Sequence, residues 1–337
     1  MHCQFRATFT KKPCDYYIQG GFCTRSDMFR CLEYVARNTI TLSYSSVRDY
    51  TRCKRRFLYS WMYGLQPVEL PESLRMGSLV SKILGILHDS RLNTDEAEAR
   101  YKDIINTSIQ ESIDPEDEHS EGDYKLWGIK GFFDAYISKE RHHVRGIPEY
   151  EFMWKIIDYP NLHGYIDLYM EHLNTAYEFK WTTNQHWYDK FHASEQSSAY
   201  FLGVSELQNI TWVLMSPPKL KPKAKEAMLT YCERVYNDVL KYMETQYIIK
   251  KVYWRTEFDL VSYAGKLKMI SQEISRMMQM QNVVLEHAFY QNDNGCYTPS
   301  ECEYVPICSS GVIPENLYVK KSAQRSIGGQ HESIVHA

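Results

Sequence analysis

Two charged residues share one face of a segment that the sequence predicts to be a strand. Residues 176–181 read Ala-Tyr-Glu-Phe-Lys-Trp, in which polar and aromatic residues alternate. Successive side chains of a strand point to opposite faces, so Glu178 and Lys180 lie together and the three aromatic residues face a core. A Glu-x-Lys triplet alone is common in a chain with 24% charged residues, where it can equally mark a solvated strand face.

The preceding segment supplies a second carboxylate. Residues 164–170 also alternate, and apolar residues flank Asp167, where a carboxylate is unfavourable unless it has a partner. If the two segments pair as a hairpin, Asp167 and Glu178 come side by side, and adjacent carboxylates repel each other unless a cation lies between them. Oxygen ligands of this kind favour Mg²⁺ or Mn²⁺. Lys180 could then hold an attacking water and offset the charge of a phosphate.

Two more elements carry polar side chains at regular spacing. Gln196 and Tyr200 lie four residues apart in a predicted helix, 186–203, and therefore share one of its faces. Glu149 and Glu151 alternate with aromatic residues in a predicted strand. Taken alone, an ordinary amphipathic helix and a solvated strand edge explain these two patterns about as well as a functional site does.

The chain has nine cysteines, and four of them bracket the predicted core. Cys53 precedes the predicted strands, and the group Cys296-x5-Cys302-x5-Cys308 follows the last long helix. Four thiolates accommodate a 4Fe–4S cluster or a zinc ion, and the number of ligands does not choose between them. A metal centre at these positions would staple the ends of a domain together, because closing a long loop removes entropy from the unfolded chain.

A second cysteine group lies in the first tenth of the chain. It consists of Cys14-x8-Cys23-x7-Cys31, with Cys3 or His2 as a further ligand. Its first half resembles the start of a CCCH-type zinc finger, but no His follows Cys31 at finger spacing. We predict a small zinc knuckle that binds Zn²⁺, with free or buried cysteines as the alternative.

Three short motifs occur together in a specific order: Gly164-x-x-Asp167, Glu178-x-Lys180 and Gln196-x-x-x-Tyr200. Together they resemble the core of the RecB-like PD-(D/E)XK nucleases, which include nuclease domains of recombination helicases and CRISPR-adaptation exonucleases. The resemblance covers roughly residues 43–310. It implies a restriction-endonuclease-like core, Mg²⁺ or Mn²⁺ held by the Asp and the Glu, and a Lys that assists the attacking water. It also implies a Gln and a Tyr that face the site and the DNA, and an upstream acidic residue, for which Glu149 and Glu151 are the candidates.

The cysteines extend this resemblance. One cysteine before the core and three after it is the pattern of the RecB-like nucleases that carry an iron–sulfur staple. The resemblance therefore favours a 4Fe–4S cluster, rather than zinc, at Cys53, Cys296, Cys302 and Cys308.

One position departs from the family pattern. Relatives often have Gly-x-x-x-His on an early helix, with the His as an additional metal ligand, whereas here Gly77 is followed by Ser81. His88 lies about two helical turns, roughly 10 Å, further along. The departure leaves the number of catalytic metal ions open.

The elements that must position these residues follow from the change of period along the chain. Helices are predicted at 41–64, 75–92, 94–113, 125–142, 186–203, 224–247 and 257–289, and strands at 149–154, 164–170, 176–181 and 209–215. This order predicts an α/β fold with a small mixed sheet, a helical shell and a cysteine staple. We expect a cysteine-rich segment at 1–40, a nuclease domain at 41–310 and a loose tail at 311–337.

Composition limits the partners. The net charge of −3 gives no global signal for nucleic acid, so any DNA surface must be a local patch. Two basic runs could neutralise phosphates, although a solvated face explains each run better when it is taken alone. They are Arg52, Lys54, Arg55 and Arg56, and Lys219, Lys221, Lys223 and Lys225. No signal peptide or membrane span is visible, which favours a cytoplasmic location.

The function predicted from these features is a metal-dependent DNA exonuclease in recombination, repair or DNA processing. Its substrate would be DNA that is single-stranded or has a free end, and a helicase or recombination protein would be its partner. The alternative is a non-catalytic subunit of a helicase or recombination complex that binds nucleic acid and carries iron–sulfur or zinc.

Overall fold

The sheet is mixed, as the sequence predicts. The computed structural model describes residues 40–114, 120, 122–140, 144–183, 194–280, 284–297, 301–314 and 316–320. Within them the strand order is β1-β4-β5-β6-β7, with β3 paired to β4. The strands are β1 (Thr41–Leu42), β3 (Ile147–Trp154), β4 (Asn161–Met170), β5 (Thr175–Trp181), β6 (Asn209–Met215) and β7 (Ile248–Tyr253). The β1–β4 and β5–β6 pairs are parallel, whereas β4–β5 and β6–β7 are antiparallel.

The chain divides into two compact units. One unit comprises the described residues of Met1–Leu70, Met153–Gly164 and Thr256–Ala337, and the other comprises those of Pro71–Phe152 and Tyr165–Arg255. The second unit contains β5, β6 and β7, and is called the catalytic unit below. The first is called the terminal unit, because it joins segments from both ends of the chain.

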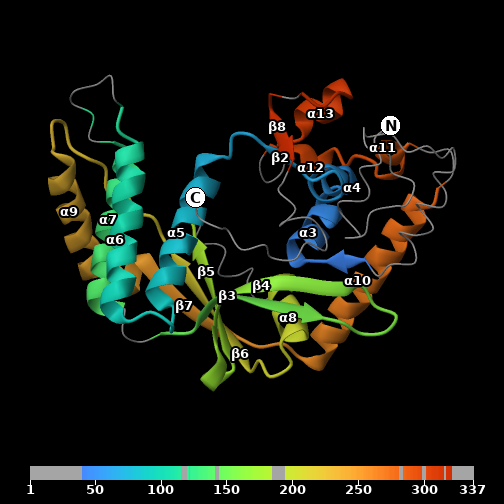
Figure 1. The fold of residues 1–337 in the computed structure, drawn as a ribbon, viewed down its shortest axis with the longest axis horizontal. Coiled ribbons are helices and arrows are strands. Elements are labelled where there is room, and N and C mark those ends of the chain that lie inside the picture. Colours follow the sequence, from blue (N-terminus) through green and yellow to red (C-terminus); the bar gives the residue numbers. More distant parts are fainter. Residues whose placement is uncertain are drawn as a thin grey trace, which may run out of the picture. The chain divides into compact units, whose positions relative to one another are not determined.

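Helices cover both faces of the sheet in the catalytic unit (Figure 1). Its four long helices are α5 (Glu72–His88), α6 (Thr94–Glu111), α7 (Tyr124–Glu140) and α9 (Met228–Tyr242). They share an apolar core with Phe179 of β5 and Val213 of β6. The short helix α8 (Glu195–Gly203) lies on the opposite face, where the indole of Trp212 in β6 donates a hydrogen bond to Ser197 at 3.2 Å.

The terminal unit is mostly helical. Its helices are α3 (Tyr44–Arg52), α4 (Lys54–Phe57), η1 (Leu58–Met62), α10 (Glu257–Met278), α11 (Leu285–Ala288), α12 (Asn294–Tyr297) and α13 (Val305–Ser310). A small antiparallel sheet pairs β2 (Leu65–Pro67) with β8 (Tyr318–Lys320). Helix α3 begins after Ser43, which forms a capping box with Ser46. The predicted helix 41–64 is interrupted at Cys53, whose backbone is extended.

Other element boundaries also differ from the predictions. The predicted helix 224–247 is α9 followed by a π-helical turn, η4 (Met243–Tyr247). The predicted helix 257–289 already ends at Met278. Strand β7 was missed because Lys250, Lys251 and Val252 are exposed in succession, which hides the alternation of a half-buried strand. In the part of the chain that the structure describes, no helix is both long and apolar enough to cross a membrane.

Candidate active site

The predicted hairpin forms and brings the two carboxylates together. The antiparallel register pairs Leu168 of β4 with Tyr177 of β5, and one further step along both strands sets Asp167 beside Glu178. The backbone N–H of Phe179 donates a hydrogen bond to Asp167 Oδ2 at 2.8 Å. The hairpin closes through the 3₁₀ turn η2 (Glu171–Leu173) and then Asn174, which adopts a left-handed backbone conformation.

Glu178 is fully buried and has several hydrogen-bond donors around it. Gln196 Nε2 donates to Glu178 Oε1 at 2.7 Å, and the Tyr200 hydroxyl donates to Oε2 at 2.5 Å. Lys180 Nζ forms an ion pair with Oε1. Gln196 Nε2 also donates to the Tyr200 hydroxyl at 2.8 Å. The structure therefore brings together all five residues that the three motifs single out: Asp167, Glu178, Lys180, Gln196 and Tyr200.

The charged groups of the site favour the binding of a cation. Burial raises the pKa of Asp167 well above its ordinary value, and the charge of Glu178 raises it further, against the opposing effects of Lys180 and the Phe179 amide. Burial and Glu178 also raise the pKa of the Tyr200 hydroxyl, which stays protonated and can donate. Two carboxylates beside one lysine leave an uncompensated negative charge, so this donor set fits a divalent ion.

The residues of the site fit a metal ion that keeps some coordination positions for water and substrate. Within the residues that the structure describes, no three His, Cys, Asp or Glu side chains gather closely enough to hold a metal ion by themselves. Mg²⁺ is commonly bound by one or two carboxylates, with waters and substrate phosphate completing its shell. Asp167 and Glu178 match that pattern, and Asp167 remains partly accessible to solvent.

The two upstream candidates, Glu149 and Glu151, are exposed on β3. Glu149 acts on the pKa of Asp167, which it raises, and it has a positive φ of 49°. Positive φ is uncommon outside glycine and strains the backbone, and such strain is often found near functional sites. Glu151 instead accepts a hydrogen bond from the Tyr165 hydroxyl at 3.4 Å. Of the two, Glu149 is the carboxylate whose charge reaches Asp167.

Helix α8 is held in place by residues that the motifs do not contain. Arg255, just after β7, donates to the Ser194 carbonyl at 2.7 Å and to the Ser198 hydroxyl at 3.1 Å. These contacts fix the first turn of α8, which carries Gln196. Lys180 Nζ lies 5.6 Å from the centre of the Trp212 ring, which orients the lysine. No sequence signal marks Arg255, because it acts through a contact between residues about sixty positions apart.

His88 belongs to the core rather than to the site. It is 1% exposed, and its ring stacks on Phe179, whose side chain points away from the Glu178 face. Its Nδ1 lies 2.7 Å from the Val144 carbonyl and its Nε2 lies 2.8 Å from the Tyr136 hydroxyl. Both ring nitrogens are therefore engaged, and His88 does not replace the histidine that relatives carry. Ser81 is exposed on α5.

The four cysteines that bracket the core all lie in the terminal unit, as thiols. Burial raises the pKa of Cys308 to about 11, and the charges of Cys53, Cys302 and Cys296 raise it as well. The charges of the other three sulfurs thus act on Cys308, although the sequence positions span more than 250 residues. As they lie among the described residues, no three of these thiols are close enough together to hold a metal ion without moving.

Hydrogen-bond donors lie at three of these sulfurs, and Gln291 Nε2 donates to Cys296 Sγ at 3.7 Å. The backbone N–H of Asn292 donates to Cys53 Sγ at 3.4 Å, and Arg56 Nη1 donates to Cys302 Sγ at 3.6 Å. The second predicted group, Cys3, Cys14, Cys23 and Cys31, lies outside the described residues.

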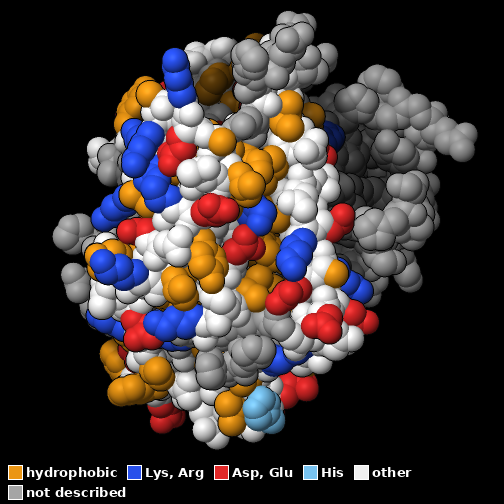
Figure 2. Space-filling model, turned by 90° about the vertical axis from the view of Figure 1, so that its left-hand side faces the viewer, with side chains coloured by type: hydrophobic (Ala, Val, Ile, Leu, Met, Phe, Trp, Pro, Cys, Tyr) orange, Lys and Arg blue, Asp and Glu red, His pale blue; other side chains and the backbone are white. Residues whose placement is uncertain are grey.

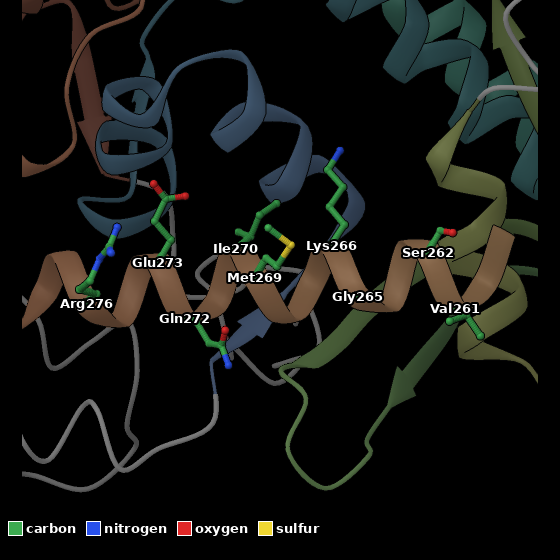
Figure 3. A pocket seen from close by; sticks show the side chains of 9 residues that line it. All are labelled: Val261, Ser262, Gly265, Lys266, Met269, Ile270, Gln272, Glu273 and Arg276. Carbon is green, nitrogen blue, oxygen red and sulfur yellow. The ribbon is translucent and has the colours of Figure 1, made fainter. Parts of the chain in front are cut away.

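A shallow pocket along α10 is a different kind of surface (Figure 3). Its lining includes Val261 and Met269, together with Glu273. That carboxylate forms an ion pair with Lys54. A single neutralised acid offers none of the paired carboxylate chemistry of the β4–β5 hairpin, so this pocket is not a candidate for catalysis.

Comparison with known proteins identifies the superfamily of the chain. The model of the PD-(D/E)XK nuclease superfamily matches residues 41–309, and the chain belongs to that superfamily. No curated protein matches it significantly. Similar solved structures include a candidate exonuclease from Eubacterium rectale, at 10% identity and a TM-score of 0.46, covering 88% of this chain and 96% of that one. A phage-related exonuclease from Haemophilus somnus 129PT matches at 11% identity and a TM-score of 0.27, covering 58% of this chain and 91% of that one. Both structural similarities are too weak to carry an argument about activity.

Proposed function

We propose that the protein is a metal-dependent deoxyribonuclease that removes nucleotides from DNA ends. The observation that carries the proposal is the gathering of four motif residues around the fifth, the buried carboxylate of Glu178, in a chain of a nuclease superfamily. Asp167 and Glu178 would hold Mg²⁺ or Mn²⁺, with Glu149, whose charge raises the pKa of Asp167, as a further carboxylate. A bound ion of this kind activates water and stabilises the charge that develops on the phosphate.

The protein's own residues have separable roles in this proposal. Gln196 and Tyr200 fix both oxygens of Glu178, so the carboxylate cannot turn away from the site. Lys180 carries a positive charge and is 37% exposed, so it can hold a water and contact the phosphate of a substrate. Arg255 fixes the helix that carries Gln196 and Tyr200.

The proposal is tested by DNA degradation. Linear single- and double-stranded substrates, labelled at either end, would be incubated with Mg²⁺, Mn²⁺ or EDTA. We expect metal-dependent release of nucleotides from one end, and a loss of at least about a hundredfold in Lys180→Ala, because one group aligned with the transition state contributes roughly 10²–10³. Lys102→Ala is the matched control, since Lys102 only pairs with Glu98 on the surface of α6. Equal cleavage by Lys180→Ala would contradict the assignment, and cleavage of circular DNA would replace exonuclease by endonuclease action.

We further propose that Cys53, Cys296, Cys302 and Cys308 hold a 4Fe–4S cluster. Their electrostatic influence on Cys308 and the hydrogen-bond donors at three sulfurs support this, since hydrogen bonds to sulfur are a common feature of such clusters. The cluster would be structural and would complete a domain at 41–310. A role in recombination or repair beside a helicase, as the resemblance implies, is part of the same proposal.

A further inference from the structure

Four lysines follow one another on the connection between β6 and α9. Residues 216–227 are called the lysine strap here, and the lysines are Lys219, Lys221, Lys223 and Lys225. Each is exposed, and none forms an ion pair with a carboxylate among the described residues. Elsewhere in the catalytic unit, the exposed lysines Lys102, Lys125 and Lys139 each have an acidic partner, whereas Lys82 and Lys241 form no ion pair with a described carboxylate. The face formed by α6, α7 and α9 carries many Lys and Arg side chains, gathered towards one margin (Figure 2).

The strap backbone is fixed by the first turns of α9. The Tyr231 hydroxyl donates to the Leu220 carbonyl at 3.0 Å, and Arg234 Nη2 donates to the Lys221 carbonyl at 2.8 Å. Arg234 also binds both oxygens of Glu226, at 2.9 and 2.7 Å, and Glu226 accepts the Lys223 N–H at 2.7 Å. A loop that was merely solvated would not need these contacts.

The same contacts leave the strap positively charged. Hydrogen bonds from Arg234 and from the Lys223 amide lower the pKa of Glu226 to about 2. Glu226 is the sole carboxylate of the strap, and its charge is already neutralised by Arg234. Apart from the influence of Lys223 on Glu226, the four lysines therefore have no counter-ion from the strap itself.

Three prolines restrict the strap further. Pro217, Pro218 and Pro222 fix their own φ and favour an extended conformation in the residues before them, and the stretch that they span contains Lys219 and Lys221. The strap then turns at Lys225, which has a positive φ of 60°, and the Glu226 N–H donates to the Lys223 carbonyl at 3.1 Å. In an extended polyproline-like chain, alternate residues lie about 6 Å apart. That separation is comparable to the spacing of successive phosphates along a nucleic-acid strand. A rigid array also loses little conformational entropy when it binds.

The strap begins at the carboxyl end of β6, beside the carboxyl end of β5, the strand that carries Glu178 and Lys180. Strands β5 and β6 are parallel, and Trp181 pairs with Met215 at their carboxyl ends. The Thr182 N–H donates to the Met215 carbonyl at 2.9 Å, which extends this pairing by one step. Lys180 is the last residue but one of β5, and the strap leaves the neighbouring strand to reach α9 (Figure 1). Lys180 faces α8 and the strap leads to α9 on the other face of the sheet, so a polymer would pass around these strand ends to contact both.

We propose that the lysine strap binds the sugar–phosphate backbone of the DNA substrate beyond the bond that is cleaved. The inference rests on the proposed nuclease function and adds to it the surface that holds the polymer. Such contacts carry no sequence information, so they suit an enzyme that degrades DNA of any sequence. They would lower the KM for DNA and leave the rate at saturating DNA unchanged.

The test is the salt dependence of DNA binding. A variant with Lys219, Lys221, Lys223 and Lys225 all changed to Gln would be compared with one carrying Gln at Lys102, Lys125, Lys139 and Lys241, which loses the same charge elsewhere. A labelled linear duplex with a single-stranded overhang would be titrated in Ca²⁺ across a range of KCl concentrations. We expect the strap variant to bind roughly tenfold or more weakly, with a slope of log K against log salt smaller by about 3, since each phosphate contact contributes roughly 0.7–0.9. The control should match the wild type.

A second variant separates the geometry of the strap from its charge. The double change Arg234→Gln with Glu226→Gln releases the strap, keeps all four lysines and leaves the net charge unchanged. We expect weaker binding with the wild-type salt slope, and wild-type affinity would overturn the role of the fixed backbone.

Unchanged affinity and slope in the four-lysine strap variant would overturn the strap as a DNA surface. Wild-type protein that binds DNA through the strap but cleaves none with Mg²⁺ or Mn²⁺ would contradict the nuclease while supporting the strap. The two proposals can therefore fail separately.

Discussion

At the scale of single residues, the two carboxylates are stabilised very differently. Glu178 has donors at both oxygens, from Gln196, Tyr200 and Lys180. Asp167 accepts one backbone hydrogen bond, from Phe179, and lies against the charge of Glu178. Of the two carboxylates, Asp167 is therefore the one whose negative charge is less stabilised by the folded protein. Its ionised form should be stabilised more than that of Glu178 when a cation binds.

This asymmetry predicts how Asp167→Asn changes stability. The pKa of Asp167 is raised in the folded state above its unfolded value near 3.8, so the folded state binds more protons than the unfolded state. Its contribution to the free energy of unfolding therefore becomes less favourable as pH rises from about 4 through the raised pKa. In EDTA at neutral pH we expect Asp167→Asn to melt about 2 °C or more above the wild type, since about 1 kcal/mol shifts Tm by roughly 2–4 °C at this unit size.

The measurement is Tm against pH by calorimetry. The gap between variant and wild type should close below about pH 4, where both states of the wild type are protonated. Added Mg²⁺ should stabilise the wild type more at high pH, because the ligand must lose its proton, and should not stabilise the variant. A variant that is less stable than the wild type throughout would show that Asp167 is a structural residue.

At the scale of elements, the site depends on how closely α8 approaches the sheet. Gly203, at the end of α8, lies where a Cβ atom would come within 2.0 Å of the Phe152 ring. That ring contacts Tyr200 edge-on, with centroids 5.9 Å apart. A similar close approach joins α7 to α9, where a Cβ on Gly131 would lie 2.6 Å from the Cys232 carbonyl oxygen. The first approach involves Phe152, whose ring contacts the site residue Tyr200. The second involves Cys232, which is not one of the site residues.

Alanine at these two glycines should therefore have different consequences. We expect Gly203→Ala to displace Phe152 and Tyr200, and to lower kcat at temperatures where the protein is folded. Gly131→Ala should lower the free energy of unfolding by about 1–3 kcal/mol, since overpacking against backbone is not relieved by a rotamer change, and should leave kcat unchanged. Denaturant melts and kcat for all variants test this, with Gly77→Ala as the control because its Cβ would meet no atom within 4 Å. Equal effects on kcat would refute the distinction.

At the scale of the whole molecule, segments from both ends of the chain belong to one compact unit. The terminal unit takes its residues from both ends of the sequence and from 153–164, whereas the catalytic unit holds the residues of the candidate site. All four bracketing cysteines belong to the terminal unit. A metal centre there would join α4, α12 and α13, which are too short to be stable alone.

Loss of the cysteine centre should therefore unfold one unit before the other. In Cys53→Ser we expect iron and sulfide to be lost, and amide-exchange protection to fall in α3, α4, α12 and α13. Protection in β5, β6 and α8 should be retained. Hydrogen exchange with iron, sulfide and zinc analysis measures both effects, and Cys232→Ala, in α9, should keep its iron. Zinc in place of iron would correct the metal, and full iron content in Cys53→Ser would remove this cysteine from the centre.

The sequence alone determined which residues share the faces of the candidate site. Alternation in 164–170 and 176–181 set Asp167, Glu178 and Lys180 on their faces, and the four-residue spacing of Gln196 and Tyr200 set both on one side of a helix. These are local periodicities, which the backbone geometry of strands and helices enforces wherever they occur.

Other features were decided only by the tertiary structure, because they depend on contacts between residues that are distant in the sequence. It placed His88 in the core, it assigned Arg255 to the helix that carries Gln196, and it set the charge of Glu149 where it raises the pKa of Asp167. It also added β7, whose exposed lysines hide its period, and fixed the lysine strap against α9. None of these leaves a local pattern, because packing across a sheet joins residues whose separation along the chain carries no signal.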